Sequence, residues 1–137
     1  MMTKILGIDP GRSKTGLALL DEQGKIIKLH IAVTKNISNE LQEFLLQETL
    51  SYVVIGDGTN SSVISNIVEE KLPQTPIYFV GEAHSTEEAR LLYWCENPPH
   101  GWRKLIPLTM QVPPEPLDAY AAVVQVRRWL DLQKNNK

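Results

Sequence analysis

Acidic side chains stand where several predicted strands of this 137-residue chain end. Asp9 closes the apolar run 5–8, and a glycine turn follows it at once. A buried strand that ends in Asp, with backbone packed too closely for side chains, suggests a site for a metal or a phosphate. Glu82 and Asp57 each follow a later apolar run, and Asp118 falls in the first turn of the last predicted helix. Hard divalent cations bind oxygen, and a few carboxylates with waters and substrate phosphate complete the Mg²⁺ octahedron. Two such ions about 4 Å apart can activate water for attack on a phosphodiester, and carboxylates converging on Asp9 would meet that need.

Each of these acids also has a purely structural interpretation. Asp9-Pro10-Gly11 is a common β-turn sequence for conformational reasons alone. Asp118 suits a helix N-terminus through capping and the helix dipole. Glu82 fits a solvated loop residue and Asp57 a turn residue, while Glu115 lies among prolines and is expected to be exposed. The residues by themselves leave both interpretations open.

Basic residues in the same segments are candidates for contacts with a phosphate backbone. Arg12 and Lys14 lie in the turn after Asp9, and Arg103 and Lys104 precede the last helix. Such contacts are independent of base sequence and sensitive to salt. Arg12 and Lys14 are interpreted equally well as ordinary exposed turn charges.

The first part of the chain predicts an antiparallel meander of three strands, at 3–9, 15–20 and 25–33. Asp21-Glu22-Gln23-Gly24 supplies the second hairpin turn. Apolar residues at helical spacing from Ile37 to Leu45 then predict an amphipathic helix with one face on the sheet.

The rest of the chain alternates strands and helices. Apolar runs at 52–55 and 77–80 are typical of strands buried on both faces. Asn60 or Ser61 is a candidate N-cap, and Ser85 to Glu88 form a capping box. Helices are predicted from these caps to about residues 72 and 94, and from about residue 117 until the end frays at 134–137. Between them, 97–116 holds six of the nine prolines and is predicted to be a long loop.

These elements predict an α/β fold: a mixed five-stranded sheet, in which an antiparallel meander continues into parallel strands, flanked by helices. Right-handed crossovers put the strand at 52–55 beside the first strand and the strand at 77–80 beyond it. Asp9 then lies in the middle of the sheet. Without repeats or linkers, the chain is expected to form one domain, residues 1–137.

Composition narrows the class of protein. A hydrophobic content of 42% and a charged content of 22% are typical of soluble globular proteins. The single cysteine excludes an internal disulfide and fits a reducing, cytoplasmic compartment. No segment approaches the roughly 20 apolar residues of a membrane helix, and the N-terminus does not read as a signal peptide. A net charge of −2 is unusual for a nucleic-acid-binding protein, although local patches matter more than the sum.

Three motifs, in order along nearly the whole chain, resemble a known superfamily. Gly7-Ile8-Asp9-Pro10-Gly11 with Thr15-Gly16 looks like the first motif of RuvC-type Holliday-junction resolvases and their YqgF relatives, within the RNase H-like fold. Residues 81–89, GEAHSTEEA, are similar to the YqgF motif in which an acidic pair precedes two hydroxyl residues and a helix. Asp118-Ala119-Tyr120-Ala121-Ala122 is similar to the last motif, whose aspartate opens the C-terminal helix.

The resemblance implies a catalytic and metal-binding triad of Asp9, Glu82 and Asp118, with Asp9 bridging two Mg²⁺ or Mn²⁺ ions. Glu115 matches an additional acid of the resolvases, and Asp57 lies near their second acid, so both are reserve acids. The implied activity is a metal-dependent nuclease for structured RNA, such as a ribosomal RNA precursor, or for branched DNA. No membrane partner is implied, and a homodimer is left open.

Departures from the pattern keep other functions open. Gly81 replaces the first acid of the YqgF pair, Ala83 replaces the usual arginine, and 97–116 lacks the basic run common before the last motif. Residues 57–61 look more like the YqgF-like domain of Tex-type transcription-accessory proteins. The alternative is a catalytically inactive RNase H-like module that binds nucleic acid or protein. Actin-like ATPases and sugar kinases open similarly but need two such domains, so they are less favoured.

Overall fold

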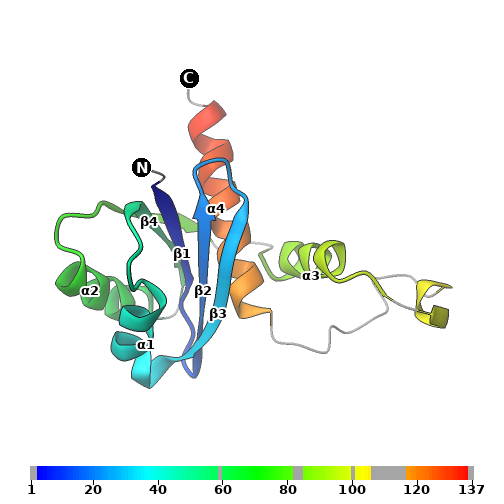
Figure 1. The fold of residues 1–137 in the computed structure, drawn as a ribbon, viewed down its shortest axis with the longest axis horizontal. Coiled ribbons are helices and arrows are strands. Elements are labelled where there is room, and N and C mark those ends of the chain that lie inside the picture. The colour runs from blue at the N-terminus through cyan, green and yellow to red at the C-terminus, as the bar shows by residue number, and fades with distance from the viewer. Residues whose placement is uncertain (1–2, 59, 82–84, 100, 106–116, 136–137) are drawn as a thin grey trace.

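The structure, a computed structural model, describes residues 3–58, 60–81, 85–99, 101–105 and 117–135. Its centre is a five-stranded sheet of order β3-β2-β1-β4-β5 (Figure 1). The first three strands are antiparallel, and β4 and β5 run parallel to β1. This confirms the predicted mixed sheet and strand order. The strand bounds are β1 (Lys4–Asp9), β2 (Lys14–Asp21), β3 (Ile26–Val33), β4 (Leu50–Asp57) and β5 (Ile77–Gly81).

Four α-helices and two 3₁₀ turns make up the other described elements. Their bounds are η1 (Thr34–Asn36), α1 (Ile37–Phe44), α2 (Ser61–Lys71), α3 (Ser85–Glu96), η2 (Gly101–Leu105) and α4 (Asp118–Asn135). Three expectations need correction. The strand at 77–80 was expected to be buried on both faces, but β5 is an edge strand in which Tyr78 and Phe79 are exposed. Helix α4 continues through Lys134 and Asn135, where fraying was expected, and η2 interrupts the segment that was predicted as a loop. No helix among the described residues is long and apolar enough to cross a bilayer.

Helices cover both faces of the sheet. Helices α1 and α2 lie on one face and α4 on the other, with α3 packed beside α4 (Figure 1). Because strand side chains alternate between faces, β1 contributes to both apolar layers. The layer beneath α1 and α2 includes Leu6, Ile8, Leu17, Leu19, Leu41, Val53, Ile55 and Ile64. The layer beneath α4 includes Ile5, Ala18, Leu20, Val54, Val80, Ala122, Val123 and Val126.

The β2–β3 hairpin forms as its sequence predicts. One carboxylate oxygen of Asp21 accepts hydrogen bonds from the backbone N–H groups of Gln23 and Lys25, both at 2.9 Å. Gly24 adopts a φ of +92°, which glycine reaches without steric cost. The same run of the sequence therefore supplies both the carboxylate and the glycine that the turn requires.

A charged cluster at the end of the sheet opposite Asp9 predicts a pH-dependent contribution to stability. The Lys4 ammonium donates a hydrogen bond to Glu48, and Lys28 lies 3.5 Å from the same carboxylate, so the pKa of Glu48 is lowered from its ordinary 4.5. A lowered pKa stabilises the fold above the ordinary pKa, and this contribution is lost as the pH falls through the folded-state pKa. Glu48→Gln is therefore expected to lower the free energy of unfolding at pH 7 by about 0.2–1 kcal/mol. The deficit should shrink below pH 4.5, as measured by urea unfolding at a series of pH values; a deficit that stays constant with pH would contradict this.

Candidate functional site

Asp9 ends β1, and its side chain is held on the α4 face of the sheet. It is half-buried, and one of its carboxylate oxygens accepts a hydrogen bond at 3.0 Å from the side-chain amide of Gln125 in α4. Alternation along β1 sends Ile5 and Gly7 to this same face. The apolar strand thus delivers one carboxylate to its carboxyl end, as the sequence predicts, and a residue far along the chain holds it there.

The first turn of α4 rests on the backbone beside Asp9. In the β1–β2 ladder, Asp9 pairs with Gly16. A Cβ on Gly16 would overlap the carbonyl oxygen of Asp118 and lie 2.7 Å from the backbone nitrogen of Ala119. Directly opposed residues of an antiparallel pair have Cα atoms about 5 Å apart. The structure therefore brings Asp9 and Asp118 to the same edge of the sheet.

Glycines on three adjacent strands let α4 approach the sheet closely. A Cβ on Gly7 would lie 2.5 Å from a methyl of Val126, and one on Gly56 would lie 2.5–2.7 Å from the amide atoms of Gln125. Together with Gly16, these glycines form a surface without side chains, against which α4 packs. Closely packed backbone at the end of β1 was expected to mark a metal or phosphate site, and at Gly7 and Gly16 the close neighbour is α4.

The remaining sequence-predicted acids are placed differently or lie outside the described residues. Asp57 ends β4 and is exposed. Its neighbour Gly56 faces α4, so alternation directs Asp57 to the opposite face from the Asp9 carboxylate. Glu82 and Glu115 lie outside the described residues. Among residues that the structure does describe, no group of three or more His, Cys, Asp or Glu side chains is arranged to hold a metal.

The loop that follows Asp9 is anchored through one carbonyl. The backbone oxygen of Gly11 accepts hydrogen bonds from the Thr34 hydroxyl at 2.9 Å and the Asn60 amide at 3.2 Å. Thr34 also bonds the hydroxyl of buried Thr15 at 2.9 Å. Of the two candidate N-caps of α2, Asn60 occupies that position, and its carbonyl oxygen accepts the hydrogen bond of Ile64 at 3.0 Å. It has a φ of +67°, and its side chain makes no cap bond. Its amide is engaged with the Gly11 loop instead.

Those predicted basic residues whose side chains the structure describes are exposed to solvent. Arg12 and Lys14 are exposed in and next to the anchored loop, and Lys104 is exposed in η2. Arg103 belongs to the same turn, but its side chain lies outside the description. Arg12 and Lys14 therefore lie at the same edge of the sheet as Asp9.

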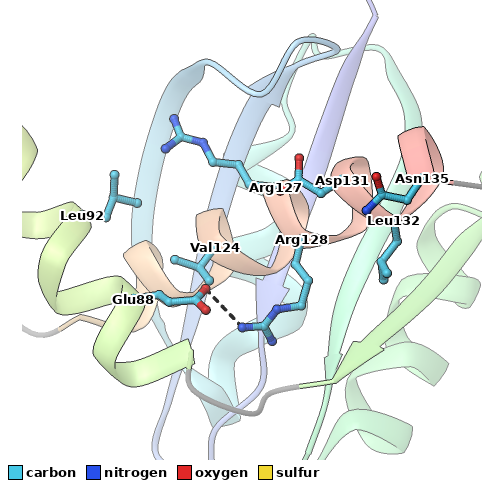
Figure 2. A pocket seen from close by; sticks show the side chains of 8 residues that line it. All are labelled: Glu88, Leu92, Val124, Arg127, Arg128, Asp131, Leu132 and Asn135. Atoms are coloured by element: carbon cyan, nitrogen blue, oxygen red, sulfur yellow. Dashed lines mark hydrogen bonds and ion pairs between the residues drawn. The ribbon is translucent and has the colours of Figure 1, made fainter.

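Arg128 joins three elements near the second motif. Its guanidinium donates to the carbonyl oxygen of Gly81, the last residue of β5, and to the Glu88 carboxylate of α3 at 3.1 Å. Figure 2 shows this ion pair beside a groove between α3 and α4, to which Arg127 and Asp131 also contribute. Glu88, predicted as part of a capping box, is therefore engaged with α4. Arg128 fixes the backbone immediately before Glu82.

Sequence reasoning missed Gln125 and Arg128 as residues of this region. Gln125 lies seven residues after Asp118, which is two helical turns along the same face. That spacing was a signal that could have connected the two. Arg128 offered no comparable signal, because its partners lie on other elements.

The donors at this edge fit a hard divalent cation. Asp9 supplies a half-buried carboxylate, and the first turn of α4 brings Asp118 beside it. Gln125 is fully buried, and its amide oxygen has no hydrogen-bond partner among the described residues. Carboxylate oxygens are ligands that Mg²⁺ and Mn²⁺ accept, and the Gln125 amide donates to one of them. Asp9 and Asp118 therefore fit part of the ligand set of such an ion, and the described residues alone do not complete that set.

Comparison with known proteins finds a relative in sequence and solved structures of similar fold. No family model matches the chain. A Mycoplasma mobile protein named "Putative pre-16S rRNA nuclease" is 33% identical over 102 residues, which cover 63% of this chain and 71% of that protein. The solved structure of Thermus thermophilus RuvC matches with a TM-score of 0.59 at 13% identity and covers 96% of each chain. A ROK family transcriptional regulator, a homologue of the E. coli MLC protein, reaches a TM-score of only 0.49 over 68% of this chain and 31% of its own. The RuvC match shows a shared fold.

Proposed function

Because the chain belongs to the YqgF/RuvC-like family, we propose that it is a divalent-metal-dependent nuclease that cleaves phosphodiester bonds in structured RNA or branched DNA. One observation carries the proposal: the turn of α4 that bears Asp118 packs on Gly16, the ladder partner of Asp9. Two acids 109 positions apart in the sequence thus share one sheet edge. The name of the Mycoplasma mobile relative favours a ribosomal RNA precursor as the substrate.

We assign the metal-binding carboxylates to Asp9, Glu82 and Asp118. Bound Mg²⁺ or Mn²⁺ would lower the pKa of a coordinated water and stabilise charge on the phosphate oxygens. The chain's own contribution is to hold its carboxylates in fixed positions before the substrate binds. Gln125 fixes Asp9, and the contact with Gly16 fixes the first turn of α4.

The pattern of β5 supports Glu82 over Asp57 as the third carboxylate. Tyr78 stacks on Trp129 of α4, with ring centroids 4.5 Å apart, and Val80 packs in the layer beneath α4. In the sequence, Glu82 stands two positions after Val80, and alternation along a strand gives that position the face that carries Asp9. Asp57 belongs to the other face, and Glu115 remains a reserve acid.

Exposed cations next to the carboxylates would bind the nucleic-acid backbone. Arg12 and Lys14 extend from the loop anchored at Gly11, and we propose that they contact phosphates, together with Arg103 and Lys104. Contacts of this kind position the substrate without reading its sequence. They also allow a chain with a net charge of −2 to bind a polyanion locally.

A cleavage assay tests the proposed function. Purified protein is incubated with Mg²⁺, Mn²⁺ or EDTA and with single-stranded RNA, a hairpin from a ribosomal RNA precursor, or a four-way DNA junction. We expect metal-dependent cutting of the hairpin in preference to the other two, and none by Asp118→Asn. Preferred cutting of the junction would retain the nuclease and change its substrate. Equal cutting by parent and variant would indicate a contaminant, and binding without cutting would favour the inactive module.

A further inference from the structure

We propose that Gln125 is a positioning residue for the metal site: its amide fixes the orientation of the Asp9 carboxylate. The inference rests on the proposed function, because it concerns the carboxylate assigned there as a metal ligand. Gln125 makes no contact with substrate in this role and acts through Asp9. Its side chain would set how tightly the ion is held and how well it is aligned.

The burial of Gln125 is unusual for a residue that only fills space. Its side chain is fully buried on the apolar face of α4, between the buried residues Val124 and Val126. Burying an amide is unfavourable unless its polar atoms are hydrogen-bonded. Here the nitrogen bonds Asp9 at 3.0 Å, while the oxygen has no hydrogen-bond partner among the described residues. An apolar side chain of similar size would pack without that cost, so packing alone does not account for glutamine.

The orientation of the amide follows from its neighbour. An ionised carboxylate only accepts hydrogen bonds, so the NH₂ group of Gln125 must face Asp9. The amide oxygen is then turned away from that carboxylate oxygen. The hydrogen bond holds one specific oxygen of Asp9 and thereby restricts rotation of the carboxylate.

Strand β4 keeps a space for this amide. A Cβ on Gly56 would lie 2.5 Å from the amide nitrogen of Gln125 and 2.7 Å from its carbon and oxygen. The Gln125 amide therefore packs directly on the backbone of Gly56 in β4, the strand next to the one that carries Asp9. Three elements, α4, β4 and β1, define its position. This is the arrangement expected of a side chain that must hold another at a fixed angle.

The consequence for function is a moderate loss upon removal of the amide. Hydrogen-bonding partners of metal ligands typically contribute 10–100-fold in metal affinity or activity. Without its donor, Asp9 still carries a charge but samples more orientations. Metal affinity and kcat should both decline, while substrate binding through the exposed cations should not.

The first test compares Gln125→Met with Gln133→Met, the same change at an exposed position of α4. Methionine keeps length and volume but has no N–H. We expect Gln125→Met to melt, without metal, at or above the parent temperature. The Mn²⁺ concentration that half-saturates its rise in melting temperature should increase by about 10–100-fold. Its kcat should fall by a similar factor with KM nearly unchanged, and Gln133→Met should match the parent throughout.

A second pair of variants separates positioning from packing. Gly56→Ala crowds the amide, so we expect both a lower melting temperature and a weaker Mn²⁺ response. Adding Gln125→Ala to Gly56→Ala removes the crowded side chain. The double variant should regain melting temperature relative to Gly56→Ala but should not regain Mn²⁺ affinity. If affinity returned together with stability, Gln125 would have only a packing role.

The outcomes distinguish this inference from the function on which it rests. Asp9→Asn is run in every series. If the parent responds to Mn²⁺, Asp9→Asn does not, and Gln125→Met matches the parent, the positioning role is overturned while the nuclease proposal survives. If the parent and Asp9→Asn are alike in both Mn²⁺ response and cleavage, the metal site itself is rejected and the inference with it.

Discussion

Asp9→Asn is expected to reduce metal-dependent cleavage by at least about 10³-fold while leaving the fold intact. That factor corresponds to about 4 kcal/mol of transition-state stabilisation, within what a carboxylate ligand to a catalytic metal ion supplies. Asparagine preserves the shape of the side chain, and its amide oxygen can still accept the hydrogen bond from Gln125. The variant therefore removes the negative charge with little change in packing.

The same variant should be at least as stable as the parent when no metal is present. Carboxylates gathered at one edge repel each other, and replacing one of them relieves that repulsion. Functional sites commonly have such a cost in stability. Mn²⁺ should raise the melting temperature of the parent through binding to the folded state and should leave Asp9→Asn unchanged. Differential scanning fluorimetry over a Mn²⁺ titration measures both quantities.

Three further variants make the result specific. Asp131→Asn removes an exposed carboxylate in the last turns of α4 and should retain the activity of the parent. Glu82→Gln and Asp57→Asn decide between the two candidates for the third carboxylate, and we expect only Glu82→Gln to be inactive. Cleavage by Asp9→Asn within tenfold of the parent would contradict the assignment of Asp9 as a ligand.

The sheet and the position of Asp9 could be predicted because both follow from local patterns. Apolar runs bounded by turn residues define each strand, and Asp21 and Gly24 specify their hairpin within a few positions of sequence. The strand order follows from the handedness of crossovers. A carboxylate at the end of a central strand then lies at one edge of the sheet, independently of which helix covers that face.

The contacts that complete the site depend on pairs far apart in the chain. Gln125 and Asp9 are 116 positions apart, and the sequence connects them only indirectly, through the spacing of Gln125 from Asp118. Asn60 illustrates the same limit at shorter range. Asn60 is the N-cap residue of α2, but its side chain makes no cap bond, and its amide donates to the Gly11 carbonyl. Local propensity is overridden where a tertiary partner is present.

The role of the glycines was the least accessible part of the site. In sequence, Gly7 and Gly16 accompany Asp9, and a close approach of backbone at this strand end suggests a ligand site. Only the packed helix reveals that they leave room for the backbone of α4. A missing side chain indicates a close approach without identifying what approaches. The first motif thus includes the glycines against which α4 packs.

Gly16→Ala is accordingly expected to be strongly destabilising. Its new methyl would overlap the carbonyl oxygen of Asp118 and lie 2.7 Å from the nitrogen of Ala119. These are backbone atoms of a helix, so the first turn of α4 must move as a unit. Overpacking of a core typically costs about 1–3 kcal/mol, and we expect the upper end or more here. Urea unfolding monitored by tryptophan fluorescence measures the loss.

Gly81→Ala is the matched control for stability, because a Cβ on Gly81 would meet no atom within 4 Å. It should change the free energy of unfolding by less than about 0.5 kcal/mol. Gly7→Ala should fall between the two, since one of its close neighbours is a methyl of Val126 that can rotate. If Gly16→Ala were as stable as Gly81→Ala, α4 would not be seated on β2 as described.

The displaced turn of α4 also carries Asp118, so Gly16→Ala links stability to the proposed chemistry. Where the variant is still folded, at low temperature, it should cut poorly and respond weakly to Mn²⁺, although every assigned carboxylate is present. A displacement of about 1 Å in a reacting group can cost about 10²-fold in rate. Gly7→Ala, whose methyl meets α4 one turn or more beyond Asp118, should lose stability with a smaller loss of Mn²⁺ affinity. If both variants lost the same Mn²⁺ affinity, the glycine contacts would position α4 as a whole rather than its first turn.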